Sequence, residues 1–151
     1  MPITADEIRT FGEAWCDTLR NGGTVAEREG FFLNHPARIY VQNTGASMTL
    51  EEHHAYHSQF ARQVLRLGEF VVAPLSEAPE RARALGSFYW EAHFPGDASP
   101  PLRCIVGEDW IVERVADGTL KFVLWLNTMH HFLPDSGVER LDLAAGPAGG
   151  R

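Results

Sequence analysis

The sequence predicts an α+β domain in which a curved antiparallel sheet carries three helices on its concave side. Three observations support this fold class. The first half contains three similar helix starts, a short β-prone segment lies between the second and third of them, and the second half contains long runs rich in aromatic and β-branched residues. The resulting order is helix, helix, short strand, helix and then an antiparallel meander of four strands.

Each expected helix begins with a threonine that is followed by a glutamate three residues later. In this capping box, the threonine hydroxyl and the glutamate carboxylate accept hydrogen bonds from backbone amides that a helix start leaves unpaired. The boxes begin at Thr4, Thr24 and Thr49. The first helix is expected to end at residues 21–23 (Asn-Gly-Gly), the second is short, and the third is expected to continue to about Leu67.

Apolar residues at three- and four-residue steps indicate which face of each helix is buried. Some of these positions in the third helix carry histidine, so that helix is expected to have polar groups on its buried face. The expected inward residues are Ile8, Phe11, Trp15 and Leu19 in the first helix, Val25, Phe32 and Leu33 in the second, and Leu50, His53, His57, Phe60, Val64 and Leu67 in the third.

The strands of the second half follow Gly68. Residues 69–75 are expected to form the first strand of the meander, and the runs 82–94, 102–115 and 120–132 form the other three. The short β-prone segment of the first half covers residues 37–42 and is closed by turn residues 43–45. Residues 144–151 are rich in Gly and small residues and are expected to be a disordered tail behind a single domain over residues 1–143.

Composition limits the possible partners and location. The net charge of −7 without a basic stripe argues against nucleic acid as a partner. The chain has no apolar run long enough to cross a bilayer and no signal-peptide pattern, so we expect a cytoplasmic protein without a membrane partner. Cys16 and Cys104 are expected to be reduced, buried thiols, with a single disulfide between them as the alternative.

The hairpin between the last two strands predicts which side chains share a face. A two-residue turn at Asp117-Gly118 pairs Ala116 with Thr119, and side chains alternate between faces along each strand. One face then combines aromatic walls with a few polar groups, as in a pocket lining. A dimer interface is the alternative, because Trp and Met are enriched there too. The pairs expected on this face are Trp110 with Trp125, Glu108 with Asn127, Val106 with Met129, and Cys104 with His131, whereas His130 is expected to be exposed.

Glu91 and His93 form a second group of titratable residues, on the strand before this hairpin. They are two residues apart and therefore share a face with Tyr89. A carboxylate beside an imidazole can raise the pKa of the imidazole and orient it as a general base. The alternative is a solvated or purely structural pair.

His53 and His57 form a third group. They are four residues apart on the expected third helix, a spacing that can chelate zinc. A metalloprotease motif would need a glutamate at the position of His54, and a third ligand would have to come from elsewhere in the chain. We therefore predict no metal site here and keep a metal-free pocket role or a capping role for these residues.

The order of elements resembles the nuclear transport factor 2-like superfamily and its SnoaL-like branch. The resemblance covers Thr4 to Phe132 and is carried by Phe11 and Trp15, by residues 34–40, and by residues 118–120. It implies a cone whose interior holds a small, mostly apolar ligand, and often a homodimer formed through the sheet. The superfamily contains both enzymes and non-catalytic binding domains.

The individual enzymes of the superfamily match this chain to different degrees. Limonene epoxide hydrolase has an arginine and an aspartate where Glu91 and His93 stand, and an acid where Trp125 stands, so its reaction is not expected here. Scytalone dehydratase uses histidines, tyrosines and an asparagine, and the resemblance implies that Tyr40, His93 and Asn127 could play such parts.

Together, the residues and the resemblance predict a SnoaL-like enzyme that acts on an apolar, oxygenated substrate by acid/base chemistry without a cofactor. The reaction would be a dehydration, an isomerisation or a cyclisation. His93, oriented by Glu91, would be the general base or acid, while Tyr40 and Asn127 would hold the substrate oxygen. A non-catalytic ligand-binding or dimerisation domain and a metal-assisted enzyme are the alternatives. The expected pocket residues are Trp15, His57, Trp90, Glu108, Trp110, Trp125 and Met129.

Overall fold

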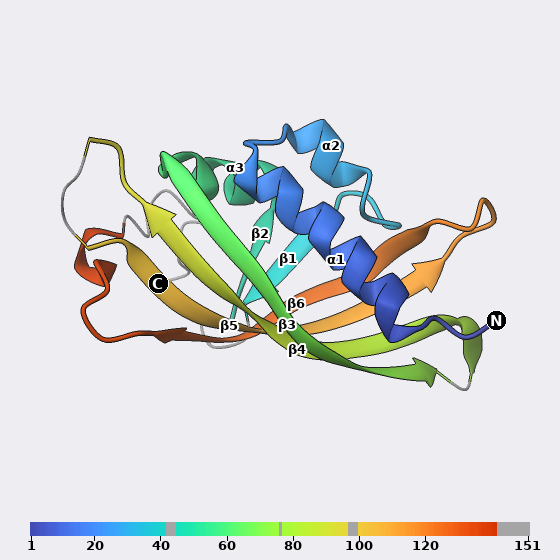
Figure 1. Ribbon diagram of the computed structural model, residues 1–151. Helices are drawn as coiled ribbons and strands as arrows, with labels where there is room; N and C mark the ends of the chain where they lie inside the picture. Colours follow the sequence, from blue (N-terminus) through green and yellow to red (C-terminus); the bar gives the residue numbers. More distant parts are fainter. Residues whose placement is uncertain (42–44, 76, 97–99, 142–151) are drawn as a thin grey trace.

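The computed structural model describes residues 1–41, 45–75, 77–96 and 100–141, so the expected tail at 144–151 lies outside the described residues. The chain forms three α-helices, six strands and a short 3-10 helix (Figure 1). In chain order these are α1 (Ala5–Arg20), α2 (Val25–Glu29), β1 (Arg38–Val41), β2 (Ala46–Thr49), α3 (Leu50–Ser58), β3 (Arg62–Leu75), β4 (Ala78–His93), β5 (Leu102–Arg114), β6 (Leu120–Phe132) and η1 (Val138–Arg140).

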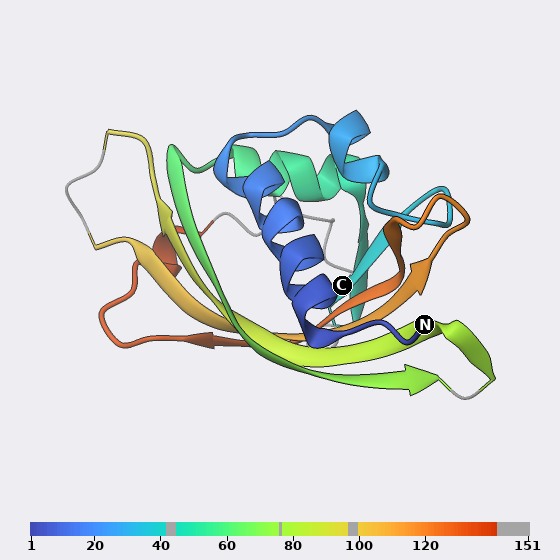
Figure 2. The ribbon, with the colours of Figure 1, turned by 45° about the vertical axis from the view of Figure 1, so that its right-hand side comes forward.

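The six strands form one curved sheet in the order β2-β1-β6-β5-β4-β3. Strands β3 to β6 are the expected antiparallel meander. Strand β1 runs parallel to β6, so the sheet is mixed, and the unexpected strand β2 pairs with β1 at the edge. All three helices lie on the concave side of the sheet (Figure 2), which confirms the α+β fold class.

The three capping boxes are confirmed at Thr4, Thr24 and Thr49. They fix where the helices begin, and α1 then lies directly on the sheet. A Cβ atom at Gly12 would come within 3.1 Å of the Trp110 ring, so glycine is what allows this close approach. The same helix buries the expected Ile8, Trp15 and Leu19, and Phe11 is partly buried.

The third helix is shorter than expected, and this prediction was wrong. Helix α3 ends at Ser58, and β3 begins at Arg62 and pairs with β4 from His93 onward. The apolar steps at Phe60, Val64 and Leu67 fit a helix, but the long strand β4 needs a partner along its whole length. Backbone pairing between strands outweighs a helical pattern of apolar residues over so short a segment.

The β5–β6 hairpin has a three-residue loop and two bulges, so the predicted register is only partly right. Val115 and Thr119 close the loop, where Gly118 has a φ of 87°. An unpaired Val123 then compensates for the extra loop residue. The pairs of Trp110 with Trp125 and of Glu108 with Asn127 are therefore confirmed.

A second bulge, at Thr128, makes the predicted pairing wrong beyond this point. Val106 lies opposite His130 rather than Met129, and Cys104 lies opposite Phe132 rather than His131. The expected exposure of His130 is also wrong, because its side chain is partly buried, while His131 is exposed. An additional residue in one strand exchanges the faces of every side chain after it.

The core lies between the concave face of the sheet and the helices. The thiols of Cys16 and Cys104 are free and buried within it, as expected. Among the described residues, no helix has both the length and the apolar character needed to cross a bilayer. Alternate residues of β4 and β5 form a large part of the inner face, namely Ala82, Ala84, Phe88, Trp90 and Ala92 of β4 and Leu102, Cys104, Val106, Glu108, Trp110 and Val112 of β5.

Candidate functional site

Glu108 is a carboxyl group in the centre of the concave face, with only 1% of its surface exposed. Its two oxygens each accept one hydrogen bond, from Trp110 Nε1 at 2.7 Å and from Asn127 Nδ2 at 2.6 Å. Burial raises the pKa of Glu108 well above its usual value, and these hydrogen bonds offset only part of the effect. Burial therefore favours the neutral form of Glu108.

His57 of α3 is held by a hydrogen-bond network that fixes the positions of its protons. Gln63 Oε1 accepts from Trp90 Nε1, which can only donate, and Gln63 Nε2 donates to the carbonyl oxygen of Leu19. His57 Nδ1, 2.7 Å from Gln63 Oε1, is therefore the protonated nitrogen. The lone pair is left on Nε2, as a general base requires.

The protein around His57 also keeps its ring neutral. A minor part of the side chain stays exposed to solvent, but burial lowers the pKa of His57 to about 3, against a smaller opposite effect of the hydrogen bond with Gln63. His57 therefore remains an uncharged base over the whole physiological pH range.

His53 lies one turn before His57 on α3, and the centres of the two rings are 4.4 Å apart. Its ring stacks on Trp15 at 5.9 Å and meets Trp125 edge-on at 5.3 Å. Burial lowers the pKa of His53 well below its usual value, with His57 and Arg28 adding to the effect. His53 Nδ1 is buried and has no hydrogen-bond partner in the described part of the chain.

Trp125 lies near both the buried acid and the imidazole of His53. It lies opposite Trp110 in the sheet, next to the pair formed by Glu108 and Asn127, and its other side meets the ring of His53. Its own Nε1 is buried and also acts on Glu108, whose pKa it lowers. A carboxyl group with a raised pKa and the imidazole of His53 with a lowered pKa thus lie around one tryptophan, and buried groups with shifted pKa values mark a candidate functional site.

Sequence reasoning missed three polar residues near this cluster. Gln63 was placed in a helix, and His130 was assigned to the wrong face because the bulge at Thr128 leaves no clear sign in the sequence. Tyr56 packs edge-on against His57 at 5.3 Å, and burial raises its pKa. The helical position of Tyr56, three residues after His53, was the one available signal.

The expected pair of Glu91 and His93 lies on the other side of the sheet. Its neighbours in β4, Trp90 and Ala92, point into the core, so Glu91 and His93 point outward. There, Glu91 Oε1 is 2.6 Å from His93 Nε2, and Glu91 Oε2 accepts a hydrogen bond from Tyr89. The hydrogen bond from Tyr89, together with that from His93, lowers the pKa of Glu91. The pair is well formed, but it is separated from Glu108 by the sheet itself.

Two further expected site residues also lie outside the concave interior. Tyr40 of β1 points away from the core and is 41% exposed, and Met129 is 45% exposed after the bulge in β6. The structure therefore brings together seven of the expected residues and separates four. Those on the concave side are Trp15, His57, Trp90, Glu108, Trp110, Trp125 and Asn127, and those outside are Tyr40, Glu91, His93 and Met129.

The histidine pair of α3 lacks the companions that a metal would need. Within the described ranges, no group of three or more His, Cys, Asp or Glu side chains is gathered for metal binding. His57 Nδ1 is also already bonded to Gln63. The pair also lies against the ring of Tyr56 and near the positive charge of Arg28, and a cation beside the imidazoles opposes metal binding.

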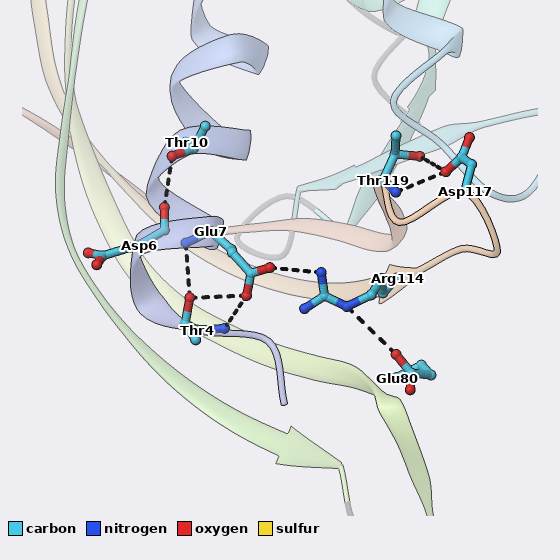
Figure 3. A network of polar contacts seen from close by, with 8 residues as sticks. All are labelled: Thr4, Asp6, Glu7, Thr10, Glu80, Arg114, Asp117 and Thr119. Atoms are coloured by element: carbon cyan, nitrogen blue, oxygen red, sulfur yellow. Dashed lines mark hydrogen bonds and ion pairs between the residues drawn. The ribbon is translucent and has the colours of Figure 1, made fainter. Parts of the chain in front are cut away.

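An open groove of about 560 Å³ lies away from this cluster, between the start of α1 and the β5–β6 hairpin. Figure 3 shows Arg114 at this place, between Glu7 and Glu80. Arg114 Nη1 donates to Glu7 Oε1 at 2.7 Å, and this bond is the main cause that lowers the pKa of Glu7 to about 2. Arg114 Nε also lies 3.7 Å from Glu80 Oε2, so this cation is paired with two carboxylates at the groove.

The architecture and the polar interior together define a nuclear transport factor 2-like fold, and comparison with solved structures agrees. A candidate scytalone dehydratase from Novosphingobium aromaticivorans is similar over 97% of this chain and 93% of its own, with a TM-score of 0.68 and 13% identity. A candidate dehydratase from Streptomyces avermitilis is similar over 82% and 94%, with a TM-score of 0.62 and 11% identity.

A nuclear transport factor 2-like protein from Salmonella enterica is similar over 90% of this chain and 95% of its own, with a TM-score of 0.66 and 10% identity. No protein-family profile and no curated protein sequence matches the chain. At such low identities the likeness concerns the fold, and the chemistry has to be argued from the side chains.

Proposed function

We propose that this protein is a small-molecule enzyme that catalyses proton transfer on an apolar, oxygenated substrate in its concave interior, without an organic cofactor. The observation that carries the proposal is the buried carboxyl group of Glu108, bonded to Trp110 and Asn127, on the same concave side of the sheet as the imidazoles of His53 and His57. Glu108 is the general acid, and His57 is the general base. Asn127 positions Glu108 through its 2.6 Å hydrogen bond.

The proposed chemistry is a dehydration or an isomerisation next to a carbonyl group. His57 Nε2 takes a proton from the carbon atom beside the carbonyl, and the electrons of that C–H bond form a C=C bond. In a dehydration, Glu108 gives its proton to the leaving hydroxyl group, which departs as water, and the proton on His57 then returns to Glu108 through solvent. General acid and base groups of this kind each contribute rate factors of about 10² to 10⁴.

The low polarity of the interior supports these assignments. A charged carboxylate or a charged imidazolium would be costly among Trp15, Trp110 and Trp125, so both groups begin the reaction neutral. Two dehydratase candidates among the similar folds fit the same class of reaction. The expected roles of Glu91, His93 and Tyr40 are not part of this proposal, because these residues lie outside the interior.

The test is a comparison of Glu108→Gln with His93→Gln. A panel of aromatic β-hydroxyketones is incubated with each protein, and loss of water is followed by mass spectrometry. We expect Glu108→Gln to reduce turnover at least about 100-fold, whereas His93→Gln on the outer face retains it. Turnover that persists in Glu108→Gln and is lost in His93→Gln would mean that the active site lies on the outer face, and it would refute the proposal.

A non-catalytic ligand-binding domain is the second candidate. It is favoured by the dense packing of the interior, where Trp15 meets Trp125 at 5.0 Å and Trp110 meets Phe122 at 5.2 Å. In this case Glu108→Gln changes ligand affinity, and the wild-type protein converts none of the compounds that it binds.

We also propose that the protein is cytoplasmic and that two copies pair through the outer face of the sheet. The proposed interface is supported by the exposed apolar side chains Tyr40 of β1, Met129 of β6 and Leu85 of β4. Sedimentation equilibrium of the wild-type protein and of Leu85→Glu tests the pairing. A monomeric wild-type protein would exclude the dimer.

A further inference from the structure

Arg28 of α2 is a buried cation whose charge is not matched by a carboxylate. Only 1% of its surface is exposed, and among the described residues its guanidinium group makes a single hydrogen bond, from Nη2 to the carbonyl oxygen of Thr18 at 3.4 Å. The Nε and Nη1 groups are buried without a partner in the described part of the chain. A guanidinium group stays protonated in proteins, so this arrangement is costly unless something else accepts its hydrogens.

Within the described ranges, no ion pair joins a carboxylate to Arg28. The carboxylate that acts on it is that of Glu27, which is exposed and occupied by the capping box of α2. Its Nη2 group bonds to α1, and α2 and α3 pack against each other, so Arg28 lies where the three helices meet. The positive charge also acts on His53 and His57, which places it close to the imidazoles of the interior.

Two more buried polar groups near Arg28 have no hydrogen-bond partner among the described residues. They are Trp15 Nε1 and His53 Nδ1, whose rings stack at 5.9 Å. Trp15 is linked to Thr18, the residue that Arg28 contacts, by a 2.8 Å hydrogen bond from Thr18 Oγ1 to the Trp15 carbonyl oxygen. Three helices thus bring four unpartnered polar atoms into one region, and at least three of them are donors.

We propose that Arg28, Trp15 and His53 form a subsite for the carboxylate of a small aromatic carboxylic acid. The subsite has one fixed positive charge and otherwise neutral donors, so it matches a monoanion rather than a phosphate dianion. Aromatic rings of Trp15 and Trp125 would contact the body of the ligand. The inference deepens the proposed function, on which it rests, by giving the substrate an anionic anchor at the end opposite to Glu108.

The subsite also gives a reason for keeping an unpaired charge in the core. Carboxylate bound in a water-poor site forms charge-assisted hydrogen bonds, which are about twice as strong as neutral ones. Losing such a contact reduces affinity by about tenfold or more. A neutral ligand of the same shape gains nothing from Arg28.

The experiment uses two probes of equal shape, 2-naphthoate and 2-naphthamide, titrated into the full chain with calorimetric detection. The variants are Arg28→Met, and Arg9→Met as a control that removes the same charge from the exposed surface of α1. We expect 2-naphthoate to bind the wild-type protein at least about tenfold more tightly than 2-naphthamide, and Arg28→Met to remove this preference. Arg9→Met should leave it unchanged.

Two outcomes would overturn the inference. One is equal affinity of the wild-type protein for the two probes, and the other is an undiminished preference for 2-naphthoate in Arg28→Met. The wild-type comparison needs no variant, so it decides the question even if Arg28→Met does not fold. Shifts of the Arg28 Nε–H and Trp15 indole resonances in the wild-type NMR spectrum upon addition of 2-naphthoate are the second expected result, and resonances that do not move would contradict the subsite.

The same data separate this inference from the proposed function. Equal binding of both probes, together with a turnover that depends on Glu108, rejects the carboxylate subsite and leaves the acid/base enzyme intact. A preference for 2-naphthoate that depends on Arg28, without Glu108-dependent turnover, supports the subsite and rejects the enzyme. If neither probe binds the wild-type protein, the subsite for aromatic carboxylates is refuted.

Discussion

Replacing Glu108 by Gln should stabilise the protein increasingly as the pH rises. Burial raises the pKa of Glu108 in the folded state above the value of 4.5 that an unperturbed carboxyl has. Between these two pKa values the unfolded chain has lost the proton and the folded protein still holds it, so the wild-type free energy of unfolding falls as the pH increases. The slope is at most about 1.4 kcal/mol per pH unit, and a glutamine has no such slope.

The packing around Glu108 indicates that glutamine can take its place. Trp110 Nε1 can donate to the new amide oxygen, and the Asn127 amide can turn over so that its oxygen accepts from the new NH₂ group. At pH 4, where both forms of the wild-type protein are protonated, the two proteins should therefore differ by only about 1 kcal/mol. Above pH 4.5 the difference in the free energy of unfolding should shift in favour of the variant by up to about 1.4 kcal/mol for each pH unit.

Urea unfolding followed by tryptophan fluorescence between pH 4 and pH 8 measures this difference directly. The buried histidines titrate in both proteins, so their contribution cancels. Glu69→Gln, which removes an exposed carboxyl from β3, is the matched control. A difference between Glu108→Gln and the wild type that stays constant with pH, or that shrinks as the pH rises, would mean that Glu108 is ionised in the folded protein.

Two further outcomes test the interior and the sheet. The pKa of His57 falls from 6.5 to about 3 on folding, so its contribution to stability is complete above pH 6.5 and is lost as the pH decreases toward 3. The free energy of unfolding of His57→Gln, measured with urea, should therefore decrease less steeply with acid than that of the wild type. Gly86→Ala places a Cβ atom 2.7 Å from the Phe70 ring and 2.8 Å from the Glu69 carbonyl oxygen. The substitution should therefore lower the free energy of unfolding by about 1 to 3 kcal/mol. An unchanged urea midpoint would contradict this packing.

Much of the fold could be predicted from local signals. The capping boxes mark helix starts because they satisfy backbone amides within four residues, and such local chemistry does not depend on the rest of the chain. The end of α3 could not be predicted in this way. It is determined by the pairing of β3 with β4, which joins residues about thirty positions apart, such as Arg62 and His93.

The candidate site was predictable in its composition and only partly in its position. Counting from the hairpin placed Glu108 and Asn127 on one face with two tryptophans, and the structure agrees. The choice between the inner and the outer face of β4 was open, because Glu91 and His93 alternate with equally plausible inward residues. Only the contact of that strand with the helices decides it. Nothing in the sequence around Arg28 indicated that this residue is buried, because an arginine without a carboxylate partner is rarely buried.

The bulge in β6 determines which side chains of its last part face the interior. Gly107 lies opposite the bulge, and a Cβ atom there would come within 2.4 Å of Thr128 Oγ1, so the glycine and the additional residue accommodate each other. In a strand that kept Thr128 in the regular ladder, Met129 would turn inward and His130 outward, while the loop and the first part of the hairpin remained the same. The bulge alone therefore gives the interior an imidazole in place of a thioether, without any substitution at the site itself.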